Sequence, residues 1–331
     1  MKDNPKAVQA LENLSERMDK IHTEVNSIIF GQDRVIEETL VTILSAGHVL
    51  LIGLPGLGKT RLVETLGHVL GLDERRVQFT PDLMPGDIIG SEILDEDDKG
   101  KRHFRFVKGP LFCQLLMADE INRASPRTQS ALLQAMQEKR VSVAGHYHEL
   151  PQPFHVLATQ NPLEQEGTYP LPEAQLDRFF MEINVQYPER DAEREILLST
   201  TGNNPKAAQR ICTAEELLEA QELVRNVPVS ESVVEAILTL VRQGRPETSD
   251  IANVKRHVAW GPGPRASQAL MSGVRARCVL HKRLSPSIDD VIALAAPILR
   301  HRMALNFAAR AEGVSLTNII DDLIAQIAPQ S

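Results

Sequence analysis

The chain has 331 residues, which is the length of about two ordinary domains. Hydrophobic residues make up 42% and charged residues 24% of the sequence, which excludes a disordered, collagen-like or disulfide-scaffold chain. The net charge of −8 and the aromatic content of 4% argue against a globally basic nucleic-acid-binding surface and a base-stacking platform, so no nucleic-acid partner is expected.

Two helices are predicted at the start of the chain. Apolar residues recur at steps of three and four from Val8 to Val25, and a second helical pattern covers about Gln32–Ser45. The first helix packs either on the protein's own body, the interpretation that we favour, or on a partner.

We expect neither a signal peptide nor a membrane span from the sequence. The start of the chain lacks the apolar stretch of a signal peptide, and the nearest candidate for a membrane span, Thr39–Gly58, is interrupted by glycine and proline. The cysteines Cys113, Cys212 and Cys278 show no CxxC spacing, which excludes zinc ribbons and thioredoxin-type motifs. We therefore expect a cytoplasmic protein without a membrane span, with inert thiols in a reducing compartment.

Five short apolar runs with few charges then alternate with helical stretches, a pattern typical of a parallel sheet covered by helices on both faces. The runs are His48–Leu54, Arg75–Thr80, Cys113–Ala118, Phe154–Thr159 and Glu182–Val185.

Two segments depart from this alternation. Arg140–Leu150 predicts a β-hairpin that turns near Ala144-Gly145. The acidic run from Glu92 to Asp98, followed by basic residues up to Arg102, predicts a solvated loop or, as a sharper alternative, a loop that contacts a partner.

Strand signals vanish after about Asp191. Thr201-Gly202-Asn203-Asn204-Pro205 predicts a turn or linker. Capping boxes at Thr213-x-x-Glu216 and Ser287-x-x-Asp290 each open a helix. Further helices are predicted over Val233–Val241, Arg265–Leu280 and Val291–Arg302. We expect an N-terminal helix (1–24), an α/β core (25–190), a linker (191–206) and an all-helical domain (207–331).

A phosphate-binding loop is predicted between the first strand and the next helix. The segment from Gly53 to Thr60 fits G-x-x-x-x-G-K-[ST] without a mismatch, in the strand-to-helix context that the motif requires. Backbone N–H groups and the helix N-terminus bind phosphate oxygens, Lys59 reaches the β- and γ-phosphates, and the Thr60 hydroxyl holds Mg²⁺. The nucleotide-binding residues expected here are Gly53, Pro55, Gly56, Leu57, Gly58, Lys59, Thr60 and Arg61.

Two further strand ends supply the remaining chemistry of an ATPase. Asp119 and Glu120 end an apolar strand, Asp119 as the Walker-B partner of Mg²⁺ and Glu120 as the group that polarises the attacking water. Asn161 follows another apolar strand and is the candidate to position water or sense the γ-phosphate, although Asn-Pro alone is a turn signal.

These residues together resemble the AAA+ ATPases and, among them, the MoxR family. The resemblance covers roughly Val25 to Ile327. The strings that carry it are Gly47–Leu51, Asp119–Ala124, Thr128–Glu138, Ala158–Pro162 and Leu171–Phe179.

The resemblance implies a P-loop α/β core with a β-hairpin insertion, a helical lid, and a homo-hexamer assembled in an ATP-dependent way, with ATP at subunit interfaces. Asn161 matches sensor 1, Arg178 the arginine finger and Arg265 sensor 2, while Gly31 and Gln32 match the segment near the adenine. Arg123 is a further candidate for crossing the interface. Arg140–Leu150 resembles the pre-sensor-1 insertion and Thr80–Gly109 the helix-2 insertion of one branch of these proteins.

A guanidinium at Arg178 suits the charge that phosphoryl transfer spreads over the γ-phosphate. The alternative is a local ion pair between Arg178 and a nearby carboxylate such as Asp177.

Three functional hypotheses remain open. The resemblance favours a MoxR-type ATPase that remodels or matures a client enzyme complex with a von Willebrand factor A domain partner, often by metal or cofactor insertion. The alternative is the motor subunit of a magnesium-chelatase-like complex. A DNA-acting motor or transcription activator is disfavoured by the acidic balance, and an ABC ATPase is excluded because Leu-Ser-Gly-Gly-Gln does not occur.

Overall fold

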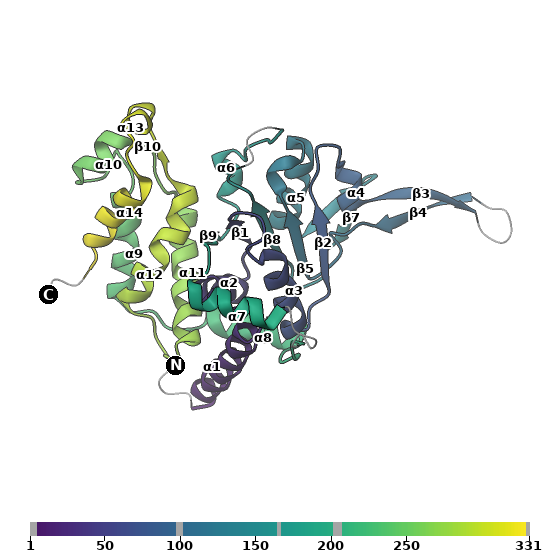
Figure 1. Cartoon of the computed structure of the whole chain (residues 1–331), viewed down its shortest axis with the longest axis horizontal. Helices are drawn as coiled ribbons and strands as arrows, with labels where there is room; N and C mark the ends of the chain where they lie inside the picture. Colours follow the sequence, from purple (N-terminus) through teal and green to yellow (C-terminus); the bar gives the residue numbers. More distant parts are fainter. Residues whose placement is uncertain (1–4, 97–101, 164–166, 201–206, 329–331) are drawn as a thin grey trace.

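The computed structural model describes residues 5–96, 102–163, 167–200 and 207–328. A five-stranded parallel sheet forms the centre of the larger domain (Figure 1). Its order is β2-β5-β8-β1-β9, and every neighbouring pair is parallel. The strands are β1 (Val49–Ile52), β2 (Glu74–Gln78), β5 (Leu115–Asp119), β8 (His155–Gln160) and β9 (Met181–Asn184). Each of the five predicted apolar runs therefore overlaps one strand of this sheet.

The strands β1, β5 and β8 are buried on both faces, which explains why they are almost continuously apolar. Along β5, Leu115 and Met117 join one core cluster, whereas Leu116 and Ala118 join the other. The first cluster includes α1 (Pro5–Asn26), α2 (Asp33–Leu44) and α3 (Lys59–Leu70). The second includes α5 (Pro126–Glu138). The apolar face of α1 thus packs on the protein's own body, as we expected.

Two β-ribbons extend from this domain. In the first, β6 (Arg140–Val143) pairs with β7 (His146–Glu149), and positive φ at Ala144 and Gly145 confirms the predicted turn. In the second, α4 (Pro85–Ile89) leads into β3 (Gly90–Glu96), which pairs with β4 (Arg102–Lys108). Figure 1 shows this second ribbon as a long arm that projects from the domain.

The expectation of a solvated loop over the acidic run was wrong for its first half. Residues Glu92–Glu96 lie in β3, and residues 97–101 lie outside the described part of the chain. The acidic strand is stabilised by basic partners on β4, as in the 2.7 Å contact between Arg105 Nε and Asp95 Oδ2.

Two helices connect the domains. Helix α7 (Arg190–Thr200) occupies most of the range that we expected to be a linker, and the predicted turn at Thr201–Pro205 lies outside the described residues. Helix α8 (Ala214–Arg225) begins with the predicted capping box of Thr213 and Glu216. It packs on α2, where Gln221 Nε2 donates to the Ile43 carbonyl at 2.8 Å.

The smaller domain is mainly helical. It contains α9 (Glu231–Gln243), α10 (Ala252–His257), α11 (Pro264–Leu280), α12 (Ile288–Leu299), α13 (Phe307–Ala311) and α14 (Leu316–Ala325). The predicted all-helical character was wrong in one detail, because β10 (Val258–Trp260) pairs with β11 (Ala304–Leu305). The helix predicted over Val291–Arg302 ends at Leu299 as α12, and a short 3-10 helix, η2 (Arg300–Arg302), follows it.

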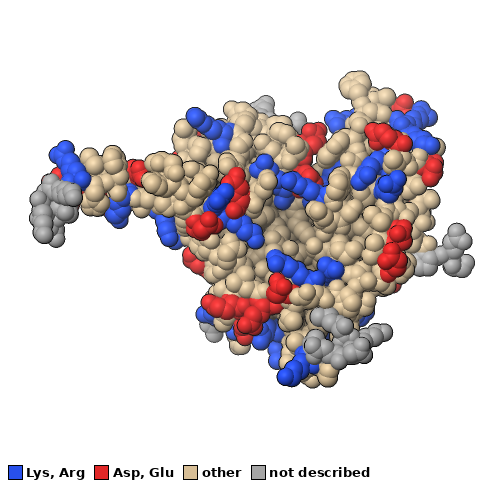
Figure 2. Space-filling view, turned by 180° about the vertical axis from the view of Figure 1, so that it is seen from behind, with Lys and Arg blue, Asp and Glu red and all other residues tan. Residues whose placement is uncertain are grey.

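The described part of the chain holds no helix that is both long and apolar enough to span a bilayer. Figure 2 shows basic and acidic side chains interspersed over the face it presents, with a hollow near the middle.

Candidate functional site

A cavity of about 470 Å³ lies where strands β1, β5 and β8 end. Its walls are the loop from Pro55 to Arg61, the acidic pair at the end of β5, and Thr159 and Asn161 of the β8 end. The carboxyl ends of neighbouring parallel strands meet at one edge of a sheet, and ligands bind there in open α/β folds. The residues predicted from three separate strand ends therefore share one cavity.

The glycine-rich loop has the backbone that its sequence predicts. Gly58 adopts φ of 75° as the N-cap of α3, a left-handed conformation that favours glycine. A Cβ at Gly53 would lie 2.8 Å from the Val185 carbonyl oxygen, so the first glycine allows a close approach of β9. Lys59 Nζ donates to the carbonyls of Gly53 (2.5 Å) and Leu54 (2.8 Å). The lysine therefore holds the loop curved around the cavity.

Burial lowers the pKa of Lys59, and the carboxylates Asp119 and Glu120 act in the opposite direction. Its ammonium group thus faces the two acidic residues across a partly dehydrated cavity, a setting in which an added polyphosphate interacts strongly with it.

The two acidic residues have different partners. Asp119 Oδ1 accepts a hydrogen bond from Thr159 Oγ1 (2.7 Å), and its Oδ2 accepts one from Arg76 Nη2 (2.6 Å). Thr159 Oγ1 in turn accepts from the backbone N–H of Glu120 at 2.8 Å. This relay between β8 and β5 fixes the orientation of both acidic residues.

Glu120 follows β5 in a left-handed backbone conformation, with φ of 56°. Its Oε2 accepts from Gln78 Nε2 (2.7 Å) and from Arg123 Nη1 (3.0 Å). Arg123, a candidate for crossing a subunit interface, thus forms an ion pair with Glu120 of its own chain. The strained backbone turns the Glu120 side chain toward β2.

Sequence reasoning missed Arg76, Gln78 and Thr159. Arg76 and Gln78 are two positions apart on β2, so their side chains point to the same face of the strand. Both of them and Thr159 line the cavity. A signal existed, since an Arg-x-Gln pattern at the end of a predicted strand places two polar groups on one face.

Asn161 is buried and lines the same cavity. Its Oδ1 accepts a hydrogen bond from the Leu163 N–H at 3.2 Å, so it also forms the turn that an Asn-Pro pair indicates. The two interpretations of this residue are therefore compatible, because Asn161 lines the cavity while its Oδ1 supports the turn.

A second, smaller cavity of about 130 Å³ adjoins the first and shares Gly56, Leu57, Gly58 and Arg61 with it. Ile28, Ile29, Phe30 and Gln32 line it, together with Pro188 and Ile196 from the α7 segment. Gln32 Nε2 donates to the Leu57 carbonyl at 2.8 Å, while its buried Oε1 has no hydrogen-bond partner among the described residues. An apolar slot with one unpaired acceptor suits a purine that carries an amino group.

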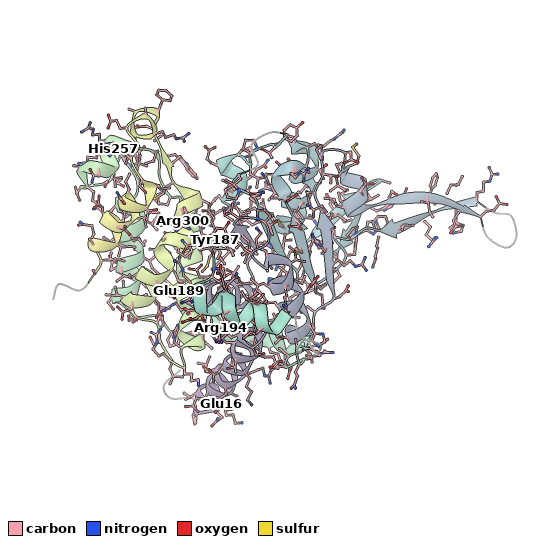
Figure 3. The ribbon with its side chains drawn as sticks, in the orientation of Figure 1. Glu16, Tyr187, Glu189, Arg194, His257 and Arg300 are labelled. Atoms are coloured by element: carbon pink, nitrogen blue, oxygen red, sulfur yellow. The ribbon has the colours of Figure 1, made fainter. Side chains whose placement is uncertain are left out.

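Gly31 lies behind this slot rather than in its lining. A Cβ there would lie 2.4 Å from Ala192 Cβ, so Gly31 lets α7 pack against the loop that precedes α2. Figure 3 shows α7 crossing the lower part of the molecule, with Arg194 labelled on it and Glu189 labelled just before its start.

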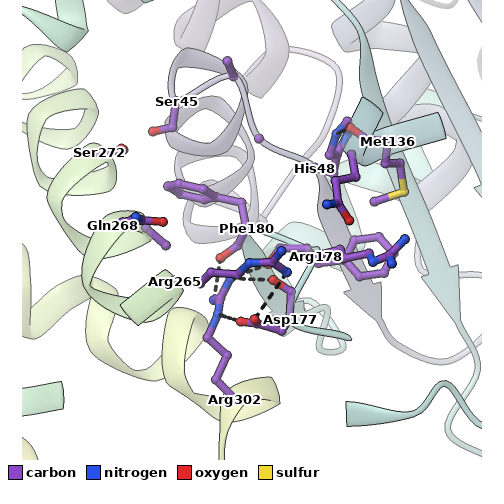
Figure 4. A pocket seen from close by; sticks show the side chains of 15 residues that line it. Ser45, His48, Met136, Asp177, Arg178, Phe180, Arg265, Gln268, Ser272 and Arg302 are labelled. Carbon is purple, nitrogen blue, oxygen red and sulfur yellow. Dashed lines mark hydrogen bonds and ion pairs between the residues drawn. The ribbon is translucent and has the colours of Figure 1, made fainter. Parts of the chain in front are cut away.

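Arg178 and Arg265 lie elsewhere. Among the residues that the structure places around the phosphate cavity, neither occurs; both line a separate cavity of about 290 Å³ between the two domains (Figure 4). Asp177 accepts there from Arg302 Nε at 2.7 Å and from Arg265 Nη1 at 3.5 Å. The alternative expectation, that Arg178 pairs with Asp177, is wrong.

The Arg178 guanidinium makes no ion pair or side-chain hydrogen bond with any residue that the structure describes. Its backbone segment is nevertheless firmly held. Arg302, whose side chain is 3% exposed, donates to the carbonyls of Phe179 (2.6 Å) and Ile298 (2.7 Å) as well as to Asp177. A charged group that is positioned without a partner is available to an anion from outside the chain.

The donor set of the phosphate cavity fits a magnesium nucleotide. An ammonium group and a helix N-terminus meet phosphate there, and a hydroxyl of Thr60 and a carboxylate of Asp119 are oxygen ligands of the kind that Mg²⁺ prefers.

Comparisons with known proteins identify the family. The model of the "ATPase family associated with various cellular activities (AAA)" matches residues 48–181, and that of an AAA lid domain matches residues 251–323. Chaperone MoxR1 of Mycobacterium tuberculosis is 44% identical over 306 residues, which are 92% of this chain and 80% of that protein. Protein MoxR of Paracoccus denitrificans is 31% identical over 299 residues, which are 85% of this chain and 87% of that protein.

A solved structure of a candidate ATPase from Cytophaga hutchinsonii matches with a TM-score of 0.90 at 37% identity, covering 98% of this chain and 99% of that chain. The fold thus agrees with that of a solved structure that matches nearly the whole chain. The chain is therefore a member of the MoxR family of AAA+ ATPases.

Proposed function

We propose that this protein binds ATP with Mg²⁺ in the phosphate cavity and hydrolyses it to ADP and phosphate. The observation that carries the proposal is the convergence of Lys59, Thr60, Asp119, Glu120 and Asn161 on one cavity from three strand ends. The adjoining apolar slot, with the unpaired Oε1 of Gln32, receives the adenine.

Each group has a distinct task in this proposal. The loop amides and Lys59 bind the β- and γ-phosphates, and Thr60 and Asp119 hold Mg²⁺, which neutralises developing charge on the phosphates. Glu120 accepts a proton from, or orients, the attacking water. Asn161 fixes the water against the γ-phosphate through its amide.

The site is completed by a neighbouring subunit. Arg178 and Arg265 line the cavity between the domains and not the phosphate cavity of their own chain. The Arg178 guanidinium also has no partner among the described residues of its own chain. We assign Arg178 as the finger that enters the neighbour's site, and place Arg265 on the same interface. A closed ring, which we propose to be a hexamer, satisfies every such head-to-tail interface.

The work that hydrolysis drives is remodelling of a client protein. A curated relative is named as a chaperone, and this supports a chaperone-like role for the present chain. We propose a von Willebrand factor A domain protein as adaptor and an enzyme complex that acquires a metal or cofactor as client.

Substitution of Lys59 tests the nucleotide site. Lys59→Ala removes charge-assisted hydrogen bonds to phosphate, so ATP affinity should fall about 100-fold or more. A fluorescent ATP analogue measures the affinity, and Lys255→Ala, a substitution of an exposed lid lysine, serves as the matched control. Unchanged affinity in folded Lys59→Ala protein would refute the site.

A further inference from the structure

The end of β2 contributes a cation to the acidic pair of the phosphate cavity. Arg76 Nη2 lies 2.6 Å from Asp119 Oδ2, and the side chains are 48% and 12% exposed respectively. The same nitrogen lies 3.2 Å from Gln78 Oε1, and Gln78 Nε2 donates to Glu120. Arg76 is therefore connected to both acidic residues of the site through one chain of polar contacts.

Both oxygens of Asp119 are engaged in this arrangement. Oδ1 accepts from Thr159 Oγ1, which also receives the Glu120 N–H, so this side is part of the relay that holds β5 and β8 in register. Oδ2 is the side that faces Arg76. The carboxylate oxygen that remains for a metal ion is thus the one that a guanidinium already neutralises.

The position of Arg76 separates it from an ordinary surface arginine. It lines the phosphate cavity with Lys59, Thr60 and Asp119, whereas its exposed neighbour Arg75 does not. Successive side chains on a strand point to opposite faces, which explains why only one of the two adjacent arginines reaches the site.

We propose that Arg76 is the resident counter-ion of the magnesium site: it neutralises Asp119 before nucleotide binds and yields Oδ2 when Mg²⁺ enters. The inference rests on the proposed nucleotide site. It adds that Arg76, on the neighbouring strand β2, competes with the metal ion for Asp119.

An isolated Asp119 carboxylate at 12% exposure would be costly without a partner, since its charge is largely removed from water. The only ammonium group lining the described cavity is that of Lys59, which is needed for phosphate and is held by two loop carbonyls. Lys59 therefore does not have to neutralise Asp119 as well as bind phosphate, because Arg76 neutralises Asp119 until the phosphates arrive. The consequence is a threshold, in which the metal must displace a guanidinium to reach its ligand.

The test is a titration of Mg²⁺ against a fixed concentration of a fluorescent ATP analogue, read as bound nucleotide rather than as turnover. Arg76→Gln removes the competing charge and keeps a shorter, polar side chain. We expect its half-saturating Mg²⁺ concentration to fall about fivefold, the range of a half-exposed ion pair. Its nucleotide affinity in EDTA should stay within about twofold of the unmodified protein.

Two further variants make the result specific. Arg75→Gln changes the net charge equally on the other face of β2 and should leave the Mg²⁺ midpoint unchanged. Arg76→Lys keeps a cation but loses the planar fork, so its midpoint should lie between those of Arg76→Gln and the unmodified protein. The lysine variant also serves if Arg76→Gln does not fold.

Three outcomes would overturn the inference. An unchanged or higher Mg²⁺ midpoint in Arg76→Gln means that Arg76 does not compete with the metal. A tenfold or greater loss of affinity in EDTA means that Arg76 binds the phosphates instead. An equal shift in Arg75→Gln means that only net charge acts. Failure of the unmodified protein to bind nucleotide would instead refute the proposed function, so the two failures are distinguishable.

Discussion

At the scale of single residues, the adjacent carboxylates of Asp119 and Glu120 have different surroundings. Asp119 is tied to Thr159 and Arg76, whereas Glu120 is turned by its positive φ toward Gln78 and Arg123. We propose that the first holds a metal ion and that the second acts on water. The division of tasks follows from backbone geometry, because neighbouring residues on a regular strand would point to opposite faces.

This division predicts the behaviour of Glu120→Gln. The amide keeps the size of the side chain and one oxygen, so ATP binding should be retained. It cannot act as a base, so the rate of phosphate release at saturating ATP should fall about 10²–10⁴-fold. Binding of a fluorescent ATP analogue and single-turnover phosphate release measure the two properties on the same sample. A variant that hydrolyses ATP at the normal rate would exclude Glu120 as the base.

At the scale of elements, buried histidines join the strand β8 to its neighbours. His48 Nδ1 accepts from the Val156 N–H at 3.0 Å, and its Nε2 lies 3.2 Å from the Met136 carbonyl. His155 Nδ1 lies 2.9 Å from the Gly47 carbonyl, with Gln221 on its other nitrogen. These contacts are satisfied by neutral rings. Burial lowers the pKa of His48 to about 3 and that of His155 to about 4, and a neighbouring His155 charge adds to the effect on His48.

The free energy of unfolding should therefore decrease in mild acid. Each ring is neutral in the folded protein, while the unfolded chain binds a proton near pH 6.5. Stability is thus full above pH 6.5 and declines as the pH falls toward 4, by about 1.4 kcal/mol per pH unit and histidine. Urea unfolding at pH 7.5 and 5.0 measures the change.

His155→Gln is the matched variant for this prediction. An amide can donate to the Gly47 carbonyl and accept from Gln221, but it does not titrate. The difference in stability between pH 7.5 and 5.0 should be smaller in the variant. An equal pH dependence in both proteins would show that His155 does not contribute.

Elements with a local signal could be predicted from the sequence, and those without one could not. The hairpin of Arg140–Leu150 and the capping box of Thr213 rest on residues close together in the chain. Strands β10 and β11, of three and two residues, are too short for any periodicity. The ion pair of Arg76 with Asp119 joins residues 43 positions apart and depends on β2 lying beside β5, an order that the alternating pattern does not determine.

At the scale of the whole molecule, the predicted chemistry is divided between two surfaces. One cavity holds the loop, the acidic pair and Asn161, while Arg178 and Arg265 line another at the junction of the domains. Buried Arg302 ties the backbone beside Arg178 to the lid helix α12 through Phe179 and Ile298. The backbone that carries Arg178 is thus attached to the lid.

Burial lowers the pKa of Arg302, and its ion pair with Asp177 opposes the effect. A buried arginine with five polar contacts holds its surroundings in one geometry. The sequence motif around Arg178 contains no indication of this clamp, because Arg302 lies 125 residues away from Asp177.

We propose that each ATP site is shared by two subunits, and mixing two inactive variants tests this arrangement most directly. Arg178→Ala subunits keep Glu120, and Glu120→Gln subunits keep Arg178. In randomly mixed rings about a quarter of the interfaces combine an intact Glu120 with the neighbour's intact Arg178. Phosphate release by the equimolar mixture should therefore exceed the sum of the two variants measured alone at the same total concentration. No recovery at any mixing ratio, under conditions in which both variants bind ATP and co-assemble, would contradict a shared site.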